Sequence, residues 1–358
     1  MTPHAQPPQP APEDTVLVDR IGPAARLGRI TLNRPRAINA LDHPMVRRIT
    51  AALAEWARDD SVAAVLITGA GERGLCAGGD IRAIRADALE GGHAAREFWR
   101  DEYLLNARIA AYPKPYIAIM DGVVMGGGVG VSAHGDVRVV TERSTVAMPE
   151  TGIGFVPDVG GTYLLSRAPG ELGTHLALTA GAIGAADTIL CGLADHFVPS
   201  DRLPALLDAL AAGDPAEAAA HHAQPAPAGV LAERRAWIDA CYAADTVEEI
   251  LDRLLDSGEP AAKEAAELIA AKSPTALKVT LEALRRARRA GSLGAVLDQE
   301  YRVSCAAVTT PDLVEGVRAQ VVDKDRRPRW SPATLAEVGA ADVEAFFAPL
   351  GERELGLG

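Results

Sequence analysis

The stretch Val62-Ala63-Ala64-Val65-Leu66-Ile67-Thr68 decides the predicted fold, because it is a nearly unbroken apolar run that ends before Gly69. Such a run, without alternating polar residues, is typical of a strand that is buried on both faces of a parallel sheet. Pro115 to Met120 repeat the pattern ahead of Gly126-Gly127-Gly128. The sequence therefore predicts an α/β fold built on a parallel sheet.

The residues before this stretch predict a hairpin followed by a helix. Two β-type runs, Thr15 to Val18 and Gly28 to Leu32, are separated by Gly22-Pro23, which favours a turn between paired strands. Asp42 and Pro44 suit the cap and the first turn of a helix. Passages from strand to helix recur through the first half of the chain.

Composition divides the chain into five predicted regions. Residues 1–13 are rich in Pro, Gln and Ala and predict a disordered tail, and residues 14–202 carry the strand patterns of the core. Residues 203–229, rich in Ala and Pro, are expected to form a flexible connection. Residues 230–345 show helical spacing and are expected to complete the fold, and residues 346–358 are expected to form a tail.

Charge and cysteine content exclude several classes of function. The chain has 358 residues, a formal net charge of −12 and 48% hydrophobic residues, which argues against a nucleic-acid or membrane partner. The N-terminal residues resemble neither a signal peptide nor a membrane anchor. The cysteines lack the spacing of metal ligands, so we expect no structural zinc and a reducing compartment, and hence a cytoplasmic protein. These cysteines are Cys76, Cys191, Cys241 and Cys305.

Two motifs bear on phosphate binding. Gly69-Ala70-Gly71-Glu72-Arg73-Gly74 satisfies G-x-G-x-x-G after a strand, but it runs into another loop instead of opening a helix, so nicotinamide binding is not expected. Arg285-Arg286-Ala287-Arg288-Arg289 is typical of a solvated helix face, and contact with a phosphorylated ligand is the alternative.

Two carboxylates lie in the apolar, Gly- and Pro-rich segment from Met148 to Gly161, namely Glu150 and Asp158. Apolar surroundings disfavour an ionised carboxylate, and two such groups in one pocket separate their pKa values, so that one can act as acid and the other as base. The alternative is that each one caps a helix or a turn.

Two glycine clusters, Ala77-Gly78-Gly79-Asp80 and Gly126-Gly127-Gly128, each follow a predicted buried strand. Glycines let bare backbone N–H groups approach a ligand, and two converging N–H groups can stabilise the negative oxygen that forms when a carbonyl is attacked. The alternative is tight packing of a helix on the sheet. Together with the carboxylate pair, the clusters favour an oxyanion hole with acid and base groups.

These residues resemble the crotonase, or enoyl-CoA hydratase/isomerase, superfamily. The resemblance rests on Gly74-Leu75-Cys76-Ala77-Gly78-Gly79-Asp80-Ile81-Arg82, on Met125-Gly126-Gly127-Gly128-Val129-Gly130 and on the segment from Met148 to Gly161. It runs from about Val16 to Val338, and within the superfamily it is most like the 3-hydroxyisobutyryl-CoA hydrolase family.

The resemblance implies a crotonase-like spiral of ββα units with a helical C-terminal region, and an acyl-CoA thioester as substrate. It implies an oxyanion hole at Gly79 and Gly127 and catalysis by Glu150 and Asp158. Glu102 matches a further residue that lines the substrate site together with Gly127, Glu150 and Asp158. No cofactor is implied, because coenzyme A is part of the substrate. A homo-oligomer is an option, since superfamily members often form trimers.

One departure from the hydratase pattern favours hydrolysis. Hydratases of the superfamily use two glutamates, and the first of them would fall at Gly130, which has no side chain. The implied reaction is hydrolysis of a short 3-hydroxyacyl-CoA thioester, 3-hydroxyisobutyryl-CoA in valine catabolism. The alternatives are an enoyl-CoA hydratase or isomerase, and a module that binds acyl-CoA without turnover.

Overall fold

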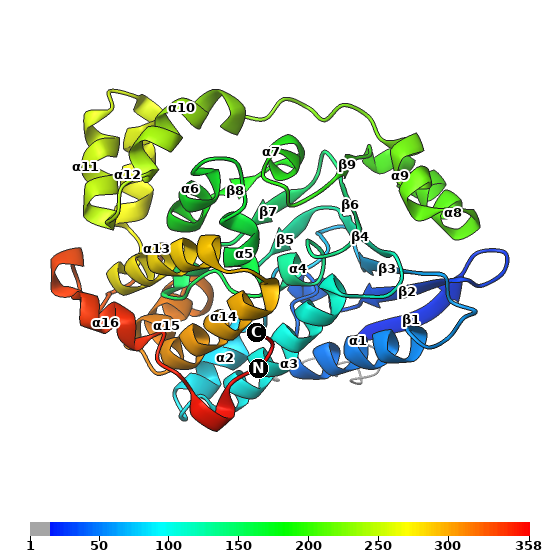
Figure 1. The fold of residues 1–358 in the computed structure, drawn as a ribbon, viewed down its shortest axis with the longest axis horizontal. Coiled ribbons are helices and arrows are strands. Elements are labelled where there is room, and N and C mark those ends of the chain that lie inside the picture. The colour runs from blue at the N-terminus through cyan, green and yellow to red at the C-terminus, as the bar shows by residue number, and fades with distance from the viewer. Residues whose placement is uncertain (1–14) are drawn as a thin grey trace, which may run out of the picture.

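Two β-sheets form the centre of the computed structural model, which describes residues 15–358 (Figure 1). The larger sheet has the strand order β1-β2-β3-β4-β6-β9, and the smaller one has the order β5-β7-β8. The strands are β1 (Val16–Ile21), β2 (Leu27–Leu32), β3 (Ala64–Gly69), β4 (Tyr116–Met120), β5 (Val123–Met125), β6 (Val137–Val140), β7 (Thr145–Ala147), β8 (Ala182–Ile183) and β9 (His196–Phe197). The predicted tail, residues 1–13, lies outside the described residues.

Helices surround these sheets, and most of the later part of the chain is helical (Figure 1). The helices of the first half are α1 (His43–Trp56), α2 (Ile81–Ala88), α3 (His93–Ala110), α4 (Gly127–Gly130), α5 (Gly161–Leu165), α6 (Leu172–Thr179) and α7 (Ala185–Leu190). Those of the second half are α8 (Leu203–Ala212), α9 (Pro215–His222), α10 (Leu231–Tyr242), α11 (Val247–Asp256), α12 (Pro260–Ala270), α13 (Pro274–Arg289), α14 (Leu293–Ala307), α15 (Pro311–Val317) and α16 (Ala340–Ala345). Shorter turns are η2 (Pro35–Ala37), η3 (Glu150–Ile153), η4 (Ser200–Arg202), the π-helical turn η5 (Arg318–Val322), η6 (Leu335–Glu337) and η7 (Gly351–Arg353).

The predicted hairpin and first helix are confirmed. β1 and β2 pair antiparallel, with Val16 opposite Leu32, and every later pair in the large sheet is parallel. The side chain of Asp42 accepts a hydrogen bond of 3.0 Å from the N–H of Met45 and so caps α1, which satisfies one of the N–H groups left free at a helix start.

The parallel strands are buried on both faces, as the apolar run in β3 predicts. Val65 and Ile67 point into the main core between the sheets and helices. Leu66, between them, packs on the opposite face with Ile117 and Val139 in a second core. Since side chains alternate along a strand, a strand with a core on each face needs apolar residues at every position.

The structure corrects the prediction of a flexible connection over residues 203–229. This region contains α8 and α9, whose residues Leu206, Leu210 and Ala219 are buried against the outer face of the large sheet. The longest stretch without a helix is residues 223–230, which run along one side of the molecule from α9 to α10 (Figure 1). The apolar face of α8 explains the difference, because its burial stabilises the helix on the sheet.

Residues 346–358 also differ from the predicted tail, because they are docked on α3 and α14. The carboxylate of Asp298 accepts hydrogen bonds from the N–H groups of Leu357 (3.0 Å) and Gly358 (2.8 Å). Glu354 pairs with Arg302 at 2.9 Å, and its carbonyl accepts a hydrogen bond from Arg100 at 3.1 Å.

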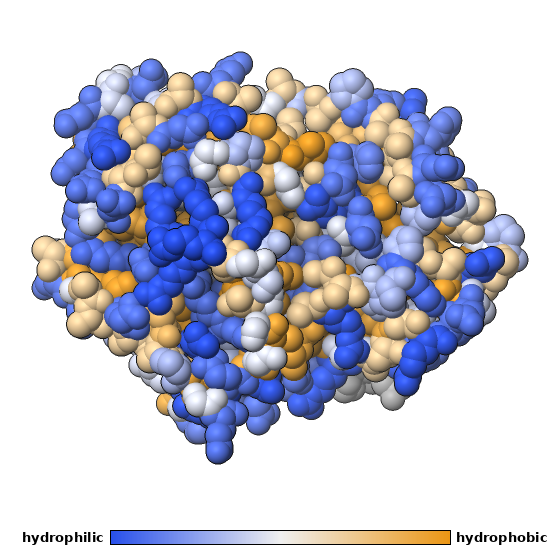
Figure 2. All heavy atoms as spheres, viewed as in Figure 1, coloured by the Kyte–Doolittle hydropathy of each residue, from blue (hydrophilic) through white to orange (hydrophobic). Residues whose placement is uncertain are grey.

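Hydrophilic side chains cover much of the face shown in Figure 2, including a strongly hydrophilic group over α13. Within residues 15–358, no helix combines the length and the apolar character that crossing a membrane requires. All four cysteines are buried and free.

Candidate active site

One cavity of about 390 Å³ contains all of the predicted site residues: Gly79, Glu102, Gly127, Glu150 and Asp158. These residues come from four separate parts of the chain: the loop before α2, helix α3, the start of α4, and the segment that includes η3. The fold therefore brings together side chains and backbone groups that lie far apart in the sequence.

Two backbone N–H groups, those of Gly79 and Gly127, lie on the same part of this cavity. The loop at Gly79 is held on both sides: the N–H of Leu41 donates to the carbonyl of Gly78, and the N–H of Asp80 donates to the carbonyl of Leu41, both at 2.8 Å. Gly127 is the first residue of α4, so its N–H has no partner within the helix. Over residues 15–358 neither N–H donates to another group of the chain.

Glycine at position 127 keeps this part of the cavity open. A Cβ atom at Gly127 would lie 3.4 Å from the amide nitrogen of Gly79 and 2.6 Å from Oε1 of Glu102. A side chain there would press on the glutamate and cover the neighbouring amide. The two N–H groups and the Glu102 carboxyl therefore border one small space.

Glu150 begins η3, and its side chain is buried, with an exposed fraction of 6%. Its Oε2 has no hydrogen-bond partner in the described part of the chain. Burial, and next the charge of Asp158, raise the pKa of Glu150 well above its usual value, because water is excluded and a second carboxylate lies near. A carboxyl with a free oxygen and a raised pKa is a candidate base or nucleophile.

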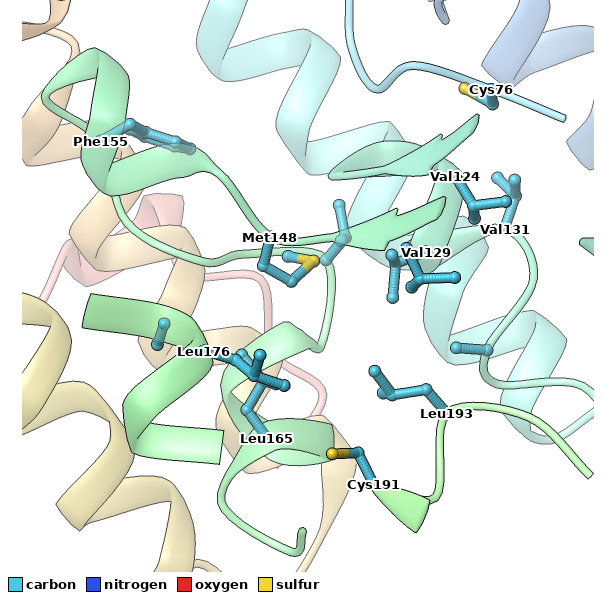
Figure 3. Packing of buried hydrophobic residues seen from close by; sticks show 14 of the residues in the cluster. Cys76, Val124, Val129, Val131, Met148, Phe155, Leu165, Leu176, Cys191 and Leu193 are labelled. Carbon is cyan, nitrogen blue, oxygen red and sulfur yellow. The ribbon is translucent and has the colours of Figure 1, made fainter. Parts of the chain in front are cut away.

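The segment that carries Glu150 is anchored by apolar residues on both sides of η3. Met148 and Phe155, on either side of η3, lie among the residues of the main core, as Figure 3 shows. The ring of Phe155 stacks on Trp99 of α3 with centroids 5.2 Å apart. Trp99 and Phe155 line the same cavity as Glu150 and give it an apolar wall.

Asp158 is buried and is held by a residue that sequence reasoning missed. The hydroxyl of Tyr103 on α3 donates to Oδ2 of Asp158 at 2.6 Å, and the same hydroxyl lies 2.6 Å from Oγ of Ser304 on α14. Burial raises the pKa of Asp158 to about 7, and the hydrogen bond from Tyr103 lowers it. In the sequence Tyr103 lies in a segment with helical spacing, and nothing in that segment indicates a hydrogen bond to Asp158.

Glu102 precedes Tyr103 on α3 and is also buried, with its Oε1 unpartnered over residues 15–358. Burial raises its pKa well above the usual value, and the charge of Asp158 adds to this effect. The usual position of an acidic helix residue is a solvated face, so a buried Glu102 that lines the cavity is a candidate site residue.

Glu300 on α14 is a further buried carboxyl near Asp158, and no sequence pattern indicated it. Its carboxyl group accepts hydrogen bonds from the N–H of Gly160 (2.6 Å) and from the N–H and the hydroxyl of Thr162 (2.9 and 2.5 Å). Burial raises its pKa to about 8. Glu300 therefore ties the residues that follow Asp158 to the C-terminal half of the chain.

The arginine run on α13 is engaged in ion pairs at a distance from the cavity. Arg285 and Arg288 pair with Glu171 at 2.9 and 2.7 Å, and Arg286 pairs with Glu282 at 2.6 Å. The cation that lines the cavity is Lys272, which is partly buried. Sequence reasoning had not distinguished Lys272 from other surface lysines.

Buried carboxyls that share a cavity with two unpartnered amide groups are characteristic of an enzyme that acts on a carbonyl compound. A family model described as Enoyl-CoA hydratase/isomerase matches residues 27–347. The chain belongs to the enoyl-CoA hydratase/isomerase family, and the predicted crotonase-like fold is confirmed.

Several proteins resemble the chain over nearly its whole length. A 3-hydroxyisobutyryl-CoA hydrolase from Danio rerio is 43% identical over 354 residues, 96% of this chain and 91% of the relative. The crystal structure of a carnitinyl-CoA dehydratase from Mycobacterium thermoresistibile has a TM-score of 0.92 and 58% identity, covering 96% of this chain and 99% of that one. An enoyl-CoA hydratase structure from Rhodobacter sphaeroides has a TM-score of 0.89 and 43% identity, covering 95% and 99%.

These relatives overturn the prediction of a cytoplasmic location. The Danio rerio protein and the other curated hydrolases of similar identity are named as mitochondrial. The prediction depended on free cysteines, which separate reducing from oxidising compartments. They do not separate one reducing compartment from another, so the step to the cytoplasm did not follow.

Proposed function

We propose that this protein hydrolyses a short 3-hydroxyacyl-CoA thioester, with 3-hydroxyisobutyryl-CoA as the first candidate and 3-hydroxyisobutyrate and CoA as products. The observation that carries the proposal is the placement of Glu150 and Asp158 in one cavity with the free amides of Gly79 and Gly127. The names of the curated relatives support the same reaction. The reaction would belong to valine catabolism.

In the proposed mechanism the thioester carbonyl oxygen accepts hydrogen bonds from the N–H groups of Gly79 and Gly127. These donors stabilise the oxyanion as the carbonyl carbon becomes tetrahedral, and losing one such donor typically costs about 10²–10³ in rate. The carbon–sulfur bond then breaks, and the sulfur of CoA leaves with a proton.

Glu150 has two proposed roles that the geometry serves equally. Its carboxylate attacks the carbonyl carbon and forms an anhydride that water hydrolyses, or it removes a proton from a water molecule that attacks directly. Both routes need an ionised carboxylate with a free oxygen, and Oε2 of Glu150 has no partner among the described residues. Asp158 would position the substrate hydroxyl or transfer the proton to the leaving sulfur, and Glu102 would line the substrate site.

The second candidate is hydration of an enoyl-CoA or dehydration of a hydroxyacyl-CoA, as named for the two similar crystal structures. Against this candidate, the position of the first hydratase glutamate is Gly130, and Val159 and Asn106 crowd the space beside it. Glu150 alone would have to hold and activate the water. A third candidate is binding of acyl-CoA without turnover. It does not explain why several carboxyls are buried at the cavity.

Assays with a panel of CoA esters separate these candidates. We expect release of free thiol from 3-hydroxyisobutyryl-CoA, followed with a thiol reagent, and slower release from the unbranched 3-hydroxybutyryl-CoA. Loss of enoyl absorbance from crotonyl-CoA without thiol release would replace hydrolysis with hydration. Tight binding of the esters without turnover would leave only the binding module.

We propose further that hydrolysis needs no cofactor, because CoA is part of the substrate. Activity is expected to survive exhaustive dialysis against a metal chelator. A loss that added metal restores would contradict this part of the proposal.

A further inference from the structure

We propose that Tyr103 is a positioning residue that fixes the carboxylate of Asp158 in the substrate cavity, and that Ser304 sets the direction of the Tyr103 hydroxyl proton. The inference rests on the proposed function, because it assumes that Asp158 acts on the substrate. It adds two residues that do not line the cavity themselves.

The three side chains form a buried chain of hydrogen bonds across three segments. The Tyr103 hydroxyl lies 2.6 Å both from Oδ2 of Asp158 and from Oγ of Ser304. All three residues are buried: Tyr103 and Ser304 have exposed fractions of 0%, and Asp158 has one of 5%. Since bulk water does not reach Tyr103 or Ser304, the hydroxyls depend on each other and on Asp158 for partners.

The number of protons available fixes which group donates in each of these hydrogen bonds. A tyrosine hydroxyl has one proton to donate, and an ionised Asp158 can only accept. Tyr103 therefore donates to Asp158, and the hydroxyl of Ser304 donates to Tyr103. If Asp158 gains a proton, the hydroxyl protons can turn, so that Tyr103 donates to Ser304. Asp158 can thus change its charge without leaving a buried hydroxyl unpaired, which would cost stability.

Tyr103 counteracts the effect of burial on the pKa of Asp158. In the described part of the chain its hydroxyl is the side-chain donor to Asp158. Burial opposes ionisation of Asp158, and the hydrogen bond that Tyr103 donates to its carboxylate favours ionisation. Several other titratable groups surround the hydrogen bonds of Ser304, Tyr103 and Asp158. They are Glu102 on α3, Glu150 on η3, Glu300 and Tyr301 on α14, His134, which contacts the carbonyl of Val159, and Lys272 on the cavity wall.

Substitution Tyr103→Phe tests the proposal, because it removes the hydroxyl and keeps the ring. Tyr103 stabilises the ionised form of Asp158, which is the form that accepts a hydrogen bond from the substrate hydroxyl in the positioning role. Losing a hydrogen bond to this charged group should move the acidic limb of the kcat/KM profile up by about one pH unit and lower kcat at pH 7 about fivefold. The lost activity should return in part at higher pH, and KM should change less than kcat. Ser304→Ala should shift the limb in the same direction by a smaller amount.

Tyr116→Phe is the matched control. Tyr116 on β4 is equally buried, and its hydroxyl donates to the carbonyl of Val131 at 2.9 Å, away from the cavity. This variant should leave the limb where it is in the wild type. If Tyr103→Phe lowers activity by the same factor at every pH, with an unmoved limb, the tyrosine is only structural and the proposal fails.

A second readout does not depend on turnover. The carboxylic C=O band of Asp158 in the infrared spectrum, identified by its loss in Asp158→Asn, should persist to higher pH in Tyr103→Phe than in the wild type. Equal titration in both proteins would overturn the inference. If the wild type releases no CoA from any thioester, the proposed function fails while this comparison still decides the role of Tyr103.

Discussion

Val159 fills the space into which a side chain of residue 130 would project. A Cβ atom on Gly130 would lie 2.7 Å from Cβ of Val159 and 2.8 Å from Nδ2 of Asn106. Both neighbours are buried, so neither has room to withdraw. Residue 130 is the position of the first hydratase glutamate, and Val159 leaves no space there for a side chain.

This relationship predicts that hydration cannot be restored by one substitution. Gly130→Glu should not gain hydration of crotonyl-CoA, and Gly130→Ala should lower the free energy of unfolding by about 1–3 kcal/mol, the usual cost of overpacking. Gly291→Ala is the control, because a Cβ there meets no atom within 4 Å. A Gly130→Ala protein as stable as the control in urea unfolding would contradict the packing argument.

Glu150→Gln and Asp158→Asn should each lower kcat for CoA release by about 10²–10⁴, the range expected for a lost acid or base. Each change keeps the size of the side chain and removes a buried charge, so the melting temperature should stay the same or rise. Glu267→Gln, at an exposed carboxylate on α12, should change neither quantity. Near-normal turnover in either cavity variant would remove that residue from the mechanism.

Glu300 should make the folded protein less stable as the pH rises toward 8. Burial raises its pKa to about 8, above the value in an unfolded chain, so the folded protein binds this proton more tightly. Its contribution to stability is therefore full at acidic pH and is lost as the pH rises toward 8, by at most about 1.4 kcal/mol for each pH unit.

The difference in unfolding free energy between the wild type and Glu300→Gln isolates this contribution. Urea unfolding of both proteins between pH 5 and pH 8 should show the wild type losing stability relative to the variant as the pH rises. Parallel curves over this range would show that Glu300 keeps the same protonation in the folded and unfolded states.

Lys272 should contribute to binding of the charged part of the substrate. It lines the cavity, and burial lowers its pKa, yet it has no ion pair within residues 15–358. Lys272→Met should raise KM for a CoA ester about tenfold, since one lost charge-assisted contact is worth about 1.5–3 kcal/mol. An N-acetylcysteamine thioester, which lacks the phosphates, serves as the control substrate. An equal rise in KM for both substrates would assign Lys272 to the acyl part of the site.

Helix α8 should contribute to stability, in contrast to a flexible connection. Leu206→Ala removes a side chain with an exposed fraction of 0% and should lower the free energy of unfolding by about 2–5 kcal/mol. Asp208→Ala, on the exposed side of the same helix, should have little effect. A harmless Leu206→Ala would mean that α8 unfolds independently of the sheet.

The sequence predicts those parts of the molecule whose causes are local. The apolar run of β3, the cap at Asp42 and the glycines of the two loops each carry their physical reason within a few residues. Helix α8 also had a local signal, because Leu203, Leu206 and Leu210 repeat at helical spacing. The abundance of alanine and proline around them obscured it.

The supporting residues of the site could not be predicted in this way. Tyr103 lies 55 residues from Asp158 and 201 residues from Ser304, and Glu300 lies 140 residues from Gly160. On its own helix each of these residues has an ordinary amphipathic setting. Their roles follow from the docking of α14 on α3 and α5, which no local pattern specifies.

The contact between α3 and α14 also bears on when the protein becomes an enzyme during its synthesis. Asp158 and Glu150 leave the ribosome with the first half of the chain, whereas Ser304 and Glu300 follow much later. Until α14 is made, Tyr103 lacks one of its partners and the segment after Asp158 lacks its anchor. Contacts so distant in sequence form late and slowly in folding. The nascent sheet therefore carries an unassembled site, and activity should arise only when the last helices dock.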